Sequence, residues 1–227
     1  MDTIEAIILG IVQGLTEFLP VSSSGHLQIA KALMGVEIEQ NLLFDVTLHA
    51  ATVLSTIVVL WSEVARLLRG LFSRRFNEEQ AYVLKLLLSM IPIGIVGFTL
   101  KDRLDALLES PAILLVVGCM LLVTAALLAF AYYAKPRQKA QLSYRDAFLI
   151  GVAQAVAALP GLSRSGSTIA TGLLLGNRKQ TVAQFSFLMV LAPILGETFL
   201  ELMKGNLGAQ AIGSAPLAAG FVAAFVV

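Results

Sequence analysis

Apolar residues fall into long runs along this chain of 227 residues, and polar residues collect in the short stretches between the runs. A helix needs about 20 predominantly apolar residues to cross a bilayer. Four runs reach or approach that length, namely 42–62, 81–100, 111–134 and 181–203. Shorter apolar runs cover residues 4–19, 21–35, 144–159, 165–176 and 211–227. The pattern predicts an all-α protein with several helices that cross a membrane.

Four of the shorter runs form two pairs, and a cluster of Pro, Ser and Gly divides each pair. The first cluster runs from Pro20 to Gly25, and the second from Pro160 to Gly166. A helix rises about 1.5 Å per residue, so none of these four runs crosses a bilayer alone. Broken backbone at membrane depth is tolerated only where it is buried in protein or lines a wet cavity. We therefore predict two re-entrant helical hairpins with tips near the middle of the membrane.

The two halves of the chain also resemble each other. Residues in the first half match residues of the same type 141 positions later: Gly10 and Gly151, Gln13 and Gln154, Ser22 and Ser163, Ser24 and Ser165, Gly25 and Gly166, Phe44 and Phe185. The prolines are displaced by one residue, and chance similarity between apolar helices is the alternative. The shared cluster of helix-breaking residues favours a repeat. We predict one membrane domain, residues 1–227, made of repeat 1 (about 1–140) and repeat 2 (about 141–227).

Basic residues indicate how the chain is oriented. The connections 63–80 and 135–145 each hold four basic residues, whereas 101–110 holds two basic and three acidic residues. The positive-inside rule predicts that the first two connections are cytoplasmic and the third is outside. Three spans then separate the hairpins, which enter from opposite sides as an inverted-topology repeat. Because the counterpart of 111–134 would fall beyond Val227, we expect the full protein to continue past this residue.

The composition agrees with a membrane protein. Apolar residues make up 57% and charged residues 14% of the chain, against roughly 25% charged in soluble domains. The mean hydropathy is +0.84. The net charge is +1, with no basic face that would suggest nucleic acid as a partner. With Cys119 as the one cysteine, no disulfide can form within the chain.

Ionisable side chains inside the apolar hairpins are costly and therefore informative. Glu17 and His26 flank the first serine cluster, and Arg164 lies within the second. Gln13 lies four residues before Glu17, so both share one face of a helix. A buried Glu17–Arg164 ion pair that holds the hairpins together is one interpretation. It leaves the concentration of Ser and Thr residues at the tips unexplained.

A phosphate site accounts for all of these residues. The helices 21–35 and 165–176 begin at the two tips, so their free amides and positive dipole ends favour an anion. The guanidinium of Arg164 suits phosphate oxygens. A divalent cation, Mg²⁺ or Ca²⁺, between Glu17 and the phosphates would offset the charge repulsion. The predicted phosphate-binding residues are Ser22, Ser163, Ser165, Gly166 and Thr168.

Asp45 and His49 form a second polar pair at the start of the run 42–62. Their spacing of four residues puts both on one face of a helix. They could coordinate a metal, but we favour an interfacial or interhelical hydrogen-bonding role.

Two long motifs resemble the undecaprenyl pyrophosphate phosphatase family, the integral-membrane type linked to bacitracin resistance. The first reads Gln13-Gly14-Leu15-Thr16-Glu17 and continues through Pro20 and the serines to His26; the second, Pro-Gly-x-Ser-Arg-Ser-x-x-Thr, runs from Pro160 to Thr168. The resemblance implies hydrolysis of undecaprenyl pyrophosphate to undecaprenyl phosphate and inorganic phosphate, which recycles the lipid carrier of cell-wall synthesis. It also implies a multi-pass protein of the bacterial cytoplasmic (inner) membrane, open to the periplasmic or extracellular side. Gln13 stands where some members have glutamate, which leaves one acid fewer for a metal.

The resemblance implies that Glu17, Ser23, His26 and Arg164 are catalytic. We assign Ser23 as the nucleophile, Glu17 and His26 to proton transfer, and Arg164 to stabilisation of the phosphate charge. Direct attack by water, with Ser23 only binding phosphate, is an alternative mechanism. A lipid-phosphate transporter or flippase using the same site is the alternative function. The expected partners are a polyprenyl diphosphate and membrane lipids, and the oligomeric state, including a homodimer, is open.

Overall fold

The computed structural model describes residues 1–36, 42–108, 110–133, 139–203 and 212–227. Within these ranges the regular structure is helical, with one isolated parallel bridge between Lys139 and Asn177. In chain order the helices are α1 (Thr3–Phe18), α2 (Ser23–Met34), α3 (Leu42–Val59), α4 (Trp61–Leu71), α5 (Glu78–Thr99), α6 (Lys101–Leu108), α7 (Ile113–Tyr133), α8 (Tyr144–Val156), α9 (Arg164–Leu174), α10 (Lys179–Met203) and α11 (Ser214–Val226). The all-α prediction is confirmed.

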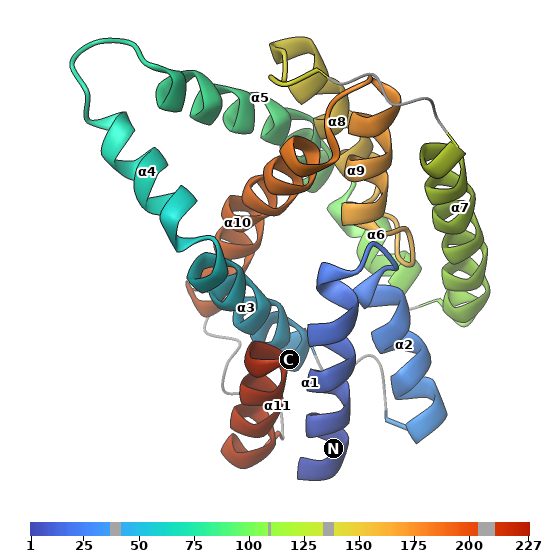
Figure 1. The fold of residues 1–227 in the computed structure, drawn as a ribbon. Helices are drawn as coiled ribbons and strands as arrows, with labels where there is room; N and C mark the ends of the chain where they lie inside the picture. The colour runs from blue at the N-terminus through green and yellow to red at the C-terminus, as the bar shows by residue number, and fades with distance from the viewer. Residues whose placement is uncertain (37–41, 109, 134–138, 204–211) are drawn as a thin grey trace.

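The helix pairs α1–α2 and α8–α9 coincide with the two predicted hairpins, and each pair meets at its Ser-rich turn (Figure 1). Two further helices, α4 and α6, occupy segments that the polarity of the sequence indicated as connections. Helix α4 is amphipathic: its Leu67 is buried, whereas Arg66 and Arg69 lie on other faces. Charged residues on one face of a helix therefore resembled a loop in the linear pattern.

Among the described residues, some helices are long and apolar enough to cross a membrane. Helices α5 and α7 qualify singly, and α3 and α4 qualify together, although a 79° bend separates their axes. The sequence predicts the apolar run 42–62 as one span, and this bend interrupts it. Residues 134–138, with the basic Lys135 and Arg137 of one connection, lie outside the described residues.

Two separate clusters of buried apolar side chains form the core. Phe44 is fully buried in a cluster that joins α1, α2, α3 and α11. Phe185, which lies 141 residues later, is fully buried in a cluster that joins α4, α5, α8 and α10. Gly10 lets α1 approach the backbone of α11, and Gly151 lets α8 approach the backbone of α5 at Ser89. Matched residues of the two halves thus occupy matched packing positions.

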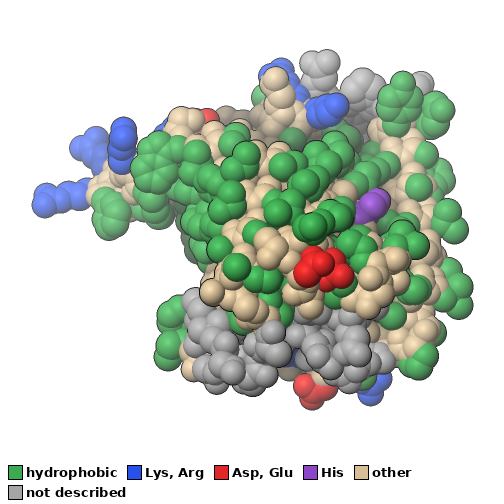
Figure 2. Space-filling view, turned by 90° about the horizontal axis from the view of Figure 1, so that it is seen from below, with side chains coloured by type: hydrophobic (Ala, Val, Ile, Leu, Met, Phe, Trp, Pro, Cys, Tyr) green, Lys and Arg blue, Asp and Glu red, His purple; other side chains and the backbone are tan. Residues whose placement is uncertain are grey.

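The outer surface carries many large apolar side chains. Phe98 is 94% exposed, and Leu115 and Leu122 are more than 70% exposed. Figure 2 shows apolar side chains over much of one face, with Lys and Arg side chains at its edges. Exposed apolar surface of this extent marks a membrane or protein contact. Together with the candidate spans, it identifies a membrane protein.

Candidate active site

The two Ser-rich turns pack directly against each other, although they lie about 140 residues apart in the chain. A Cβ added to Gly25 would meet the Cα of Gly161 at 3.2 Å, and one added to Gly166 would meet the carbonyl oxygen of Pro20 at 3.0 Å. A Cβ at either glycine would push the turns apart by a few tenths of an ångström. The helices that begin at these turns, α2 and α9, therefore start side by side.

Equivalent serines cap both helices. Ser22 Oγ accepts a hydrogen bond from the backbone N–H of Gly25 (3.2 Å), and Ser163 Oγ accepts one from Gly166 (3.0 Å). Such caps satisfy one of the free amides at a helix N-terminus. Ser22 also has a positive φ of 70°, which is uncommon for a residue with a side chain. The remaining first-turn amides and the positive dipole ends of both helices favour an anion at the turns.

A cavity of about 160 Å³ lies where the turns meet, and its lining includes Glu17, Ser23, Ser165, Arg164 and His49. Glu17 is the last-turn residue of α1, while Ser23 and Arg164 are the first residues of α2 and α9. Ser22, Ser24 and Ser163 also line the cavity. The structure therefore brings together residues of α1, α2 and α9 that the sequence analysis assigned to a common site, together with one residue of α3, His49, that it did not.

Hydrogen bonds converge on the carboxylate of Glu17. Arg164 Nη2 donates to Oε1 (3.0 Å), Ser23 Oγ donates to Oε2 (2.5 Å) and Gln13 Nε2 donates to Oε2 (3.0 Å). The side chains of Glu17 and Arg164 keep 14% and 29% of their surface exposed. A serine hydroxyl bonded to a carboxylate is the arrangement of a nucleophile beside a base. The guanidinium uses one nitrogen on Glu17 and can offer the others to an anion.

Three predicted site residues do not line this cavity. The hydroxyl of Thr168 is buried; it donates to the carbonyl oxygen of Arg164 (2.9 Å) and shares a hydrogen bond with Ser186 of α10 (2.6 Å). Gly166 is part of the turn and packs on Pro20. His26 Nδ1 bonds to the carbonyl oxygen of Ser22 (2.8 Å) on the half-buried first turn of α2. The roles of these three residues remain predictions.

A narrow cleft of about 20 Å³, with both polar and apolar lining residues, adjoins the polar cavity. The two share Glu17, Arg164 and Ser165, and the cleft continues between α1, α3 and α10. Its apolar lining includes Phe18, Val53, Phe187, Val190 and Ile194. The rings of Phe18 and Phe187 meet edge to face at 6.2 Å. The site therefore offers charged and hydroxyl groups next to a hydrophobic surface.

Asp45 is held in an ion pair that the sequence did not reveal. Lys31 of α2 is fully buried, and its Nζ donates to both carboxylate oxygens of Asp45 at 2.7 Å. This is an interhelical contact of the kind favoured for Asp45. Because run 21–35 is mainly apolar, a buried lysine was not expected there. The feature of the sequence that could have indicated this ion pair is Asp45, an acidic residue on the next helix.

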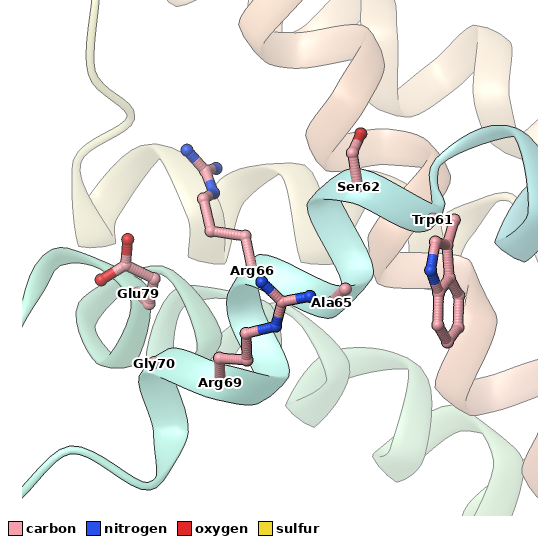
Figure 3. A pocket seen from close by; sticks show the side chains of 7 residues that line it. All are labelled: Trp61, Ser62, Ala65, Arg66, Arg69, Gly70 and Glu79. Atoms are coloured by element: carbon pink, nitrogen blue, oxygen red, sulfur yellow. The ribbon is translucent and has the colours of Figure 1, made fainter.

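A larger cavity lies elsewhere, between α4 and the start of α5 (Figure 3). It measures about 580 Å³, and Arg66 and Arg69 line it. Arg66 is already paired with Glu63 at 2.6 Å, and Figure 3 shows Ser62 pointing away from both guanidinium groups. In the described part of the chain, this cavity has no serine bonded to a carboxylate, so we assign the chemistry to the cavity at the turns.

The residues of the site are compatible with a divalent cation only if a bound ligand supplies further oxygen atoms. Among the described residues, no group of three or more His, Cys, Asp and Glu side chains is arranged to hold a metal. Glu17 offers a single carboxylate, which already accepts three hydrogen bonds. Mg²⁺ is commonly bound through one or two carboxylates together with substrate phosphates and water. Glu17 therefore suits a cation that arrives with a phosphorylated ligand.

Comparison with known proteins identifies relatives over the whole chain. A family model described as bacitracin resistance protein BacA matches residues 6–227. The undecaprenyl-diphosphatases of Parabacteroides distasonis and Bacteroides thetaiotaomicron are 62% and 58% identical to it. That of Methanosphaera stadtmanae is 35% identical. Each alignment covers 100% of this chain and 85–86% of the relative. The chain belongs to the bacitracin resistance protein BacA family.

Proposed function

We propose that this protein hydrolyses undecaprenyl pyrophosphate to undecaprenyl phosphate and inorganic phosphate. This activity recycles the lipid carrier of cell-wall synthesis and confers resistance to bacitracin. The relatives that carry the name undecaprenyl-diphosphatase support it. The observation that carries the proposal is a serine–carboxylate pair and a free guanidinium face in one cavity. We place the isoprenoid chain against the apolar side chains of Phe18, Phe187 and Val190, which lie next to the same residues.

In the proposed reaction, Ser23 Oγ attacks the terminal phosphorus and loses its proton to Glu17, to which it is already bonded. The bond between phosphorus and the bridging oxygen breaks, and undecaprenyl phosphate leaves with the electron pair. Arg164, Ser165 and the first-turn amides of α2 and α9 stabilise the charged oxygens. Ser22 and Ser163 act mainly as helix caps that fix these amides. Water then cleaves the phosphoserine and restores the enzyme.

The proposed membrane arrangement has α1–α2 and α8–α9 as re-entrant hairpins from opposite sides in an inverted repeat. The equivalent caps at Ser22 and Ser163 and the equivalent burial of Phe44 and Phe185 support a repeat. Contact between the two Ser-rich turns supports a shared site. We propose the cytoplasmic membrane as the location, with the site open to the outer side.

Phosphate release from undecaprenyl pyrophosphate by the detergent-purified protein tests the function. The wild type should release phosphate, and Ser23→Ala should lose at least about 100-fold in kcat because the nucleophile is gone. Ser73→Ala, in the exposed loop after α4, is the matched control and should behave as the wild type. A phosphoserine trapped at residue 23 would support the covalent route. Transfer of the lipid across vesicles without phosphate release would instead identify a transporter.

We propose that Glu17 would hold a divalent cation, Mg²⁺ or Ca²⁺, together with the substrate, and that the cation would offset the negative charge of the phosphates. Titration of either ion should raise phosphate release by the wild type, and chelation should lower it. Glu17→Gln removes both the base and the carboxylate ligand, so its residual activity should respond weakly to the ions. An unchanged wild-type rate after complete chelation would contradict the need for a cation.

A further inference from the structure

His49 is a polar residue of the cavity that the proposed reaction has not yet used. It lies on α3 and lines the cavity with Glu17, Ser23 and Arg164. It is half-buried. An imidazole at such a position can accept or donate a proton, a capacity that packing alone does not require.

The hydrogen bond made by its Nδ1 fixes the tautomer of His49. Nδ1 lies 2.8 Å from the carbonyl oxygen of Asp45, one helical turn earlier. A carbonyl oxygen only accepts hydrogen bonds, so Nδ1 must carry the hydrogen. In the neutral ring Nε2 is then an acceptor, free to take a proton.

An ion pair, buried on its lysine side, braces the turn that orients His49. The carboxylate of Asp45 is held through both oxygens by Lys31, which is fully buried on α2. The same helix α2 begins with Ser23. The ion pair therefore ties the helix that carries the nucleophile to the helix that carries His49.

Glu17 cannot serve both halves of the proposed reaction alone. Its carboxylate accepts hydrogen bonds from Arg164, Ser23 and Gln13, and it holds the serine proton after the first step. The water that attacks the phosphoserine must lose a proton while Glu17 is still protonated. His26 is not among the residues that line the cavity, whereas His49 is.

We propose that His49 Nε2 accepts the proton of the attacking water, an inference that rests on the proposed phosphatase function. The water oxygen bonds to phosphorus as the phosphorus–Oγ bond of the phosphoserine breaks. Glu17 returns its proton to Ser23 Oγ, and the water proton passes to His49. The products are inorganic phosphate, the free serine and a protonated imidazole, which then releases its proton to solvent.

His49→Gln and His49→Ala test the proposal with undecaprenyl pyrophosphate as the substrate. General base catalysis contributes roughly 100- to 10,000-fold, so His49→Gln should lower kcat by about 100-fold or more and leave KM within about threefold. Added imidazole should restore part of the kcat of His49→Ala, a rescue that a packing defect would not give. Gel filtration in detergent establishes that both variants are folded.

Thr47→Ala is the matched control on the same helix. Thr47 bonds to the carbonyl oxygen of Leu43, one turn earlier, as His49 does to that of Asp45, but it does not line the cavity. Its kcat should stay within about twofold of the wild type, with no response to imidazole. A folded His49→Gln with kcat within about twofold of the wild type would overturn the proposal, as would a loss confined to KM. Absence of phosphate release by the wild type would overturn the phosphatase function itself.

Discussion

At the scale of single residues, a few side chains of the site each make several contacts. Glu17 holds the serine hydroxyl through one oxygen and Arg164 through the other. Ser22, next to the nucleophile, is held at φ 70° by its cap on Gly25. Unfavourable backbone geometry of this kind persists only where surrounding contacts enforce it, and it is concentrated at functional sites. The contact between the two turns supplies that enforcement.

The geometry of Arg164 predicts that a positive charge alone cannot replace it. One guanidinium nitrogen bonds Glu17 at 3.0 Å, and in the proposed reaction the remaining donors of the planar group bind the phosphate. A lysine ammonium can keep the ion pair or bind the phosphate, but it cannot reproduce the fork. We expect Arg164→Lys to reduce kcat/KM by about 100-fold. Phosphate release measures this, with Arg74→Lys in the exposed loop as the control. Turnover near that of the wild type would remove Arg164 from its proposed role.

At the scale of elements, helix termini organise the molecule. Capping boxes begin α1, α5 and α8, so the local sequence determines where these helices start. At α8, Ser143 and Asp146 cap each other, and Lys139 lies 3.6 Å from Asp146. This turn follows a basic connection and lies outside the two single candidate spans. It anchors α8, whose other end leads into the second Ser-rich turn.

The cap at Asp146 predicts a pH dependence of stability. Burial alone would raise the pKa of this carboxyl, but hydrogen bonds from Ser143 and Asn177 and the charge of Lys139 outweigh it, so the pKa is lowered. A lowered pKa stabilises the fold above the pKa of the unfolded state, about 3.9, and this stability is lost as pH falls through the folded value. Asp146→Asn should lower Tm by about 2–4 °C at pH 7.

The same substitution should have little effect near the acid end of the range, where the wild-type carboxyl is itself protonated. Thermal unfolding in detergent at pH 7 and at successively lower pH, down to pH 2, follows the effect of the substitution into the range below the lowered pKa. Asp102→Asn, on an exposed residue of α6, is the control. A Tm difference that does not shrink between pH 7 and pH 2 would show that the charge of Asp146 does not stabilise α8.

At the scale of the whole molecule, the two halves are packed into each other and do not form separate lobes. Helix α1 of the first half packs closely on α11 of the second, and α8 of the second half packs on α5 of the first. Figure 1 shows α1 and α11 side by side. The Ser-rich turns lie between these two pairs. The site can therefore form only when both halves are present and docked.

The proposed orientation predicts which connections face the cytoplasm. In a Cys119→Ala background, we expect a membrane-impermeant maleimide to label Asp102→Cys in intact cells, because α6 should lie outside. Ser73→Cys, in the basic connection after α4, should be labelled only after the membrane is permeabilised. Both positions are exposed, so accessibility within the protein does not limit the reaction. Labelling of both cysteines in intact cells would contradict the inverted arrangement.

The sequence by itself determined the helical class, the two helix breaks and most of the polar residues that line the cavity. These features are local: apolar runs, Pro-Gly-Ser clusters and ionisable residues within apolar segments can be recognised one segment at a time. Glu17, Ser23 and Arg164 could be predicted because each is unexpected in its own surroundings. The amphipathic helix α4 could not be predicted, because the charged residues on its exposed faces made the segment resemble a loop.

Only the tertiary structure decided which of the polar residues meet. Glu17 and Arg164 are 147 residues apart, and the contact that joins them depends on glycines whose neighbours come from the other half of the chain. The burial of Lys31 depends on Asp45 from another helix. That His49 lines the cavity depends on how α3 packs against α1, and that His26 does not line it depends on the direction in which α2 leaves the turn. Such arrangements follow from packing between distant segments, which no local pattern contains.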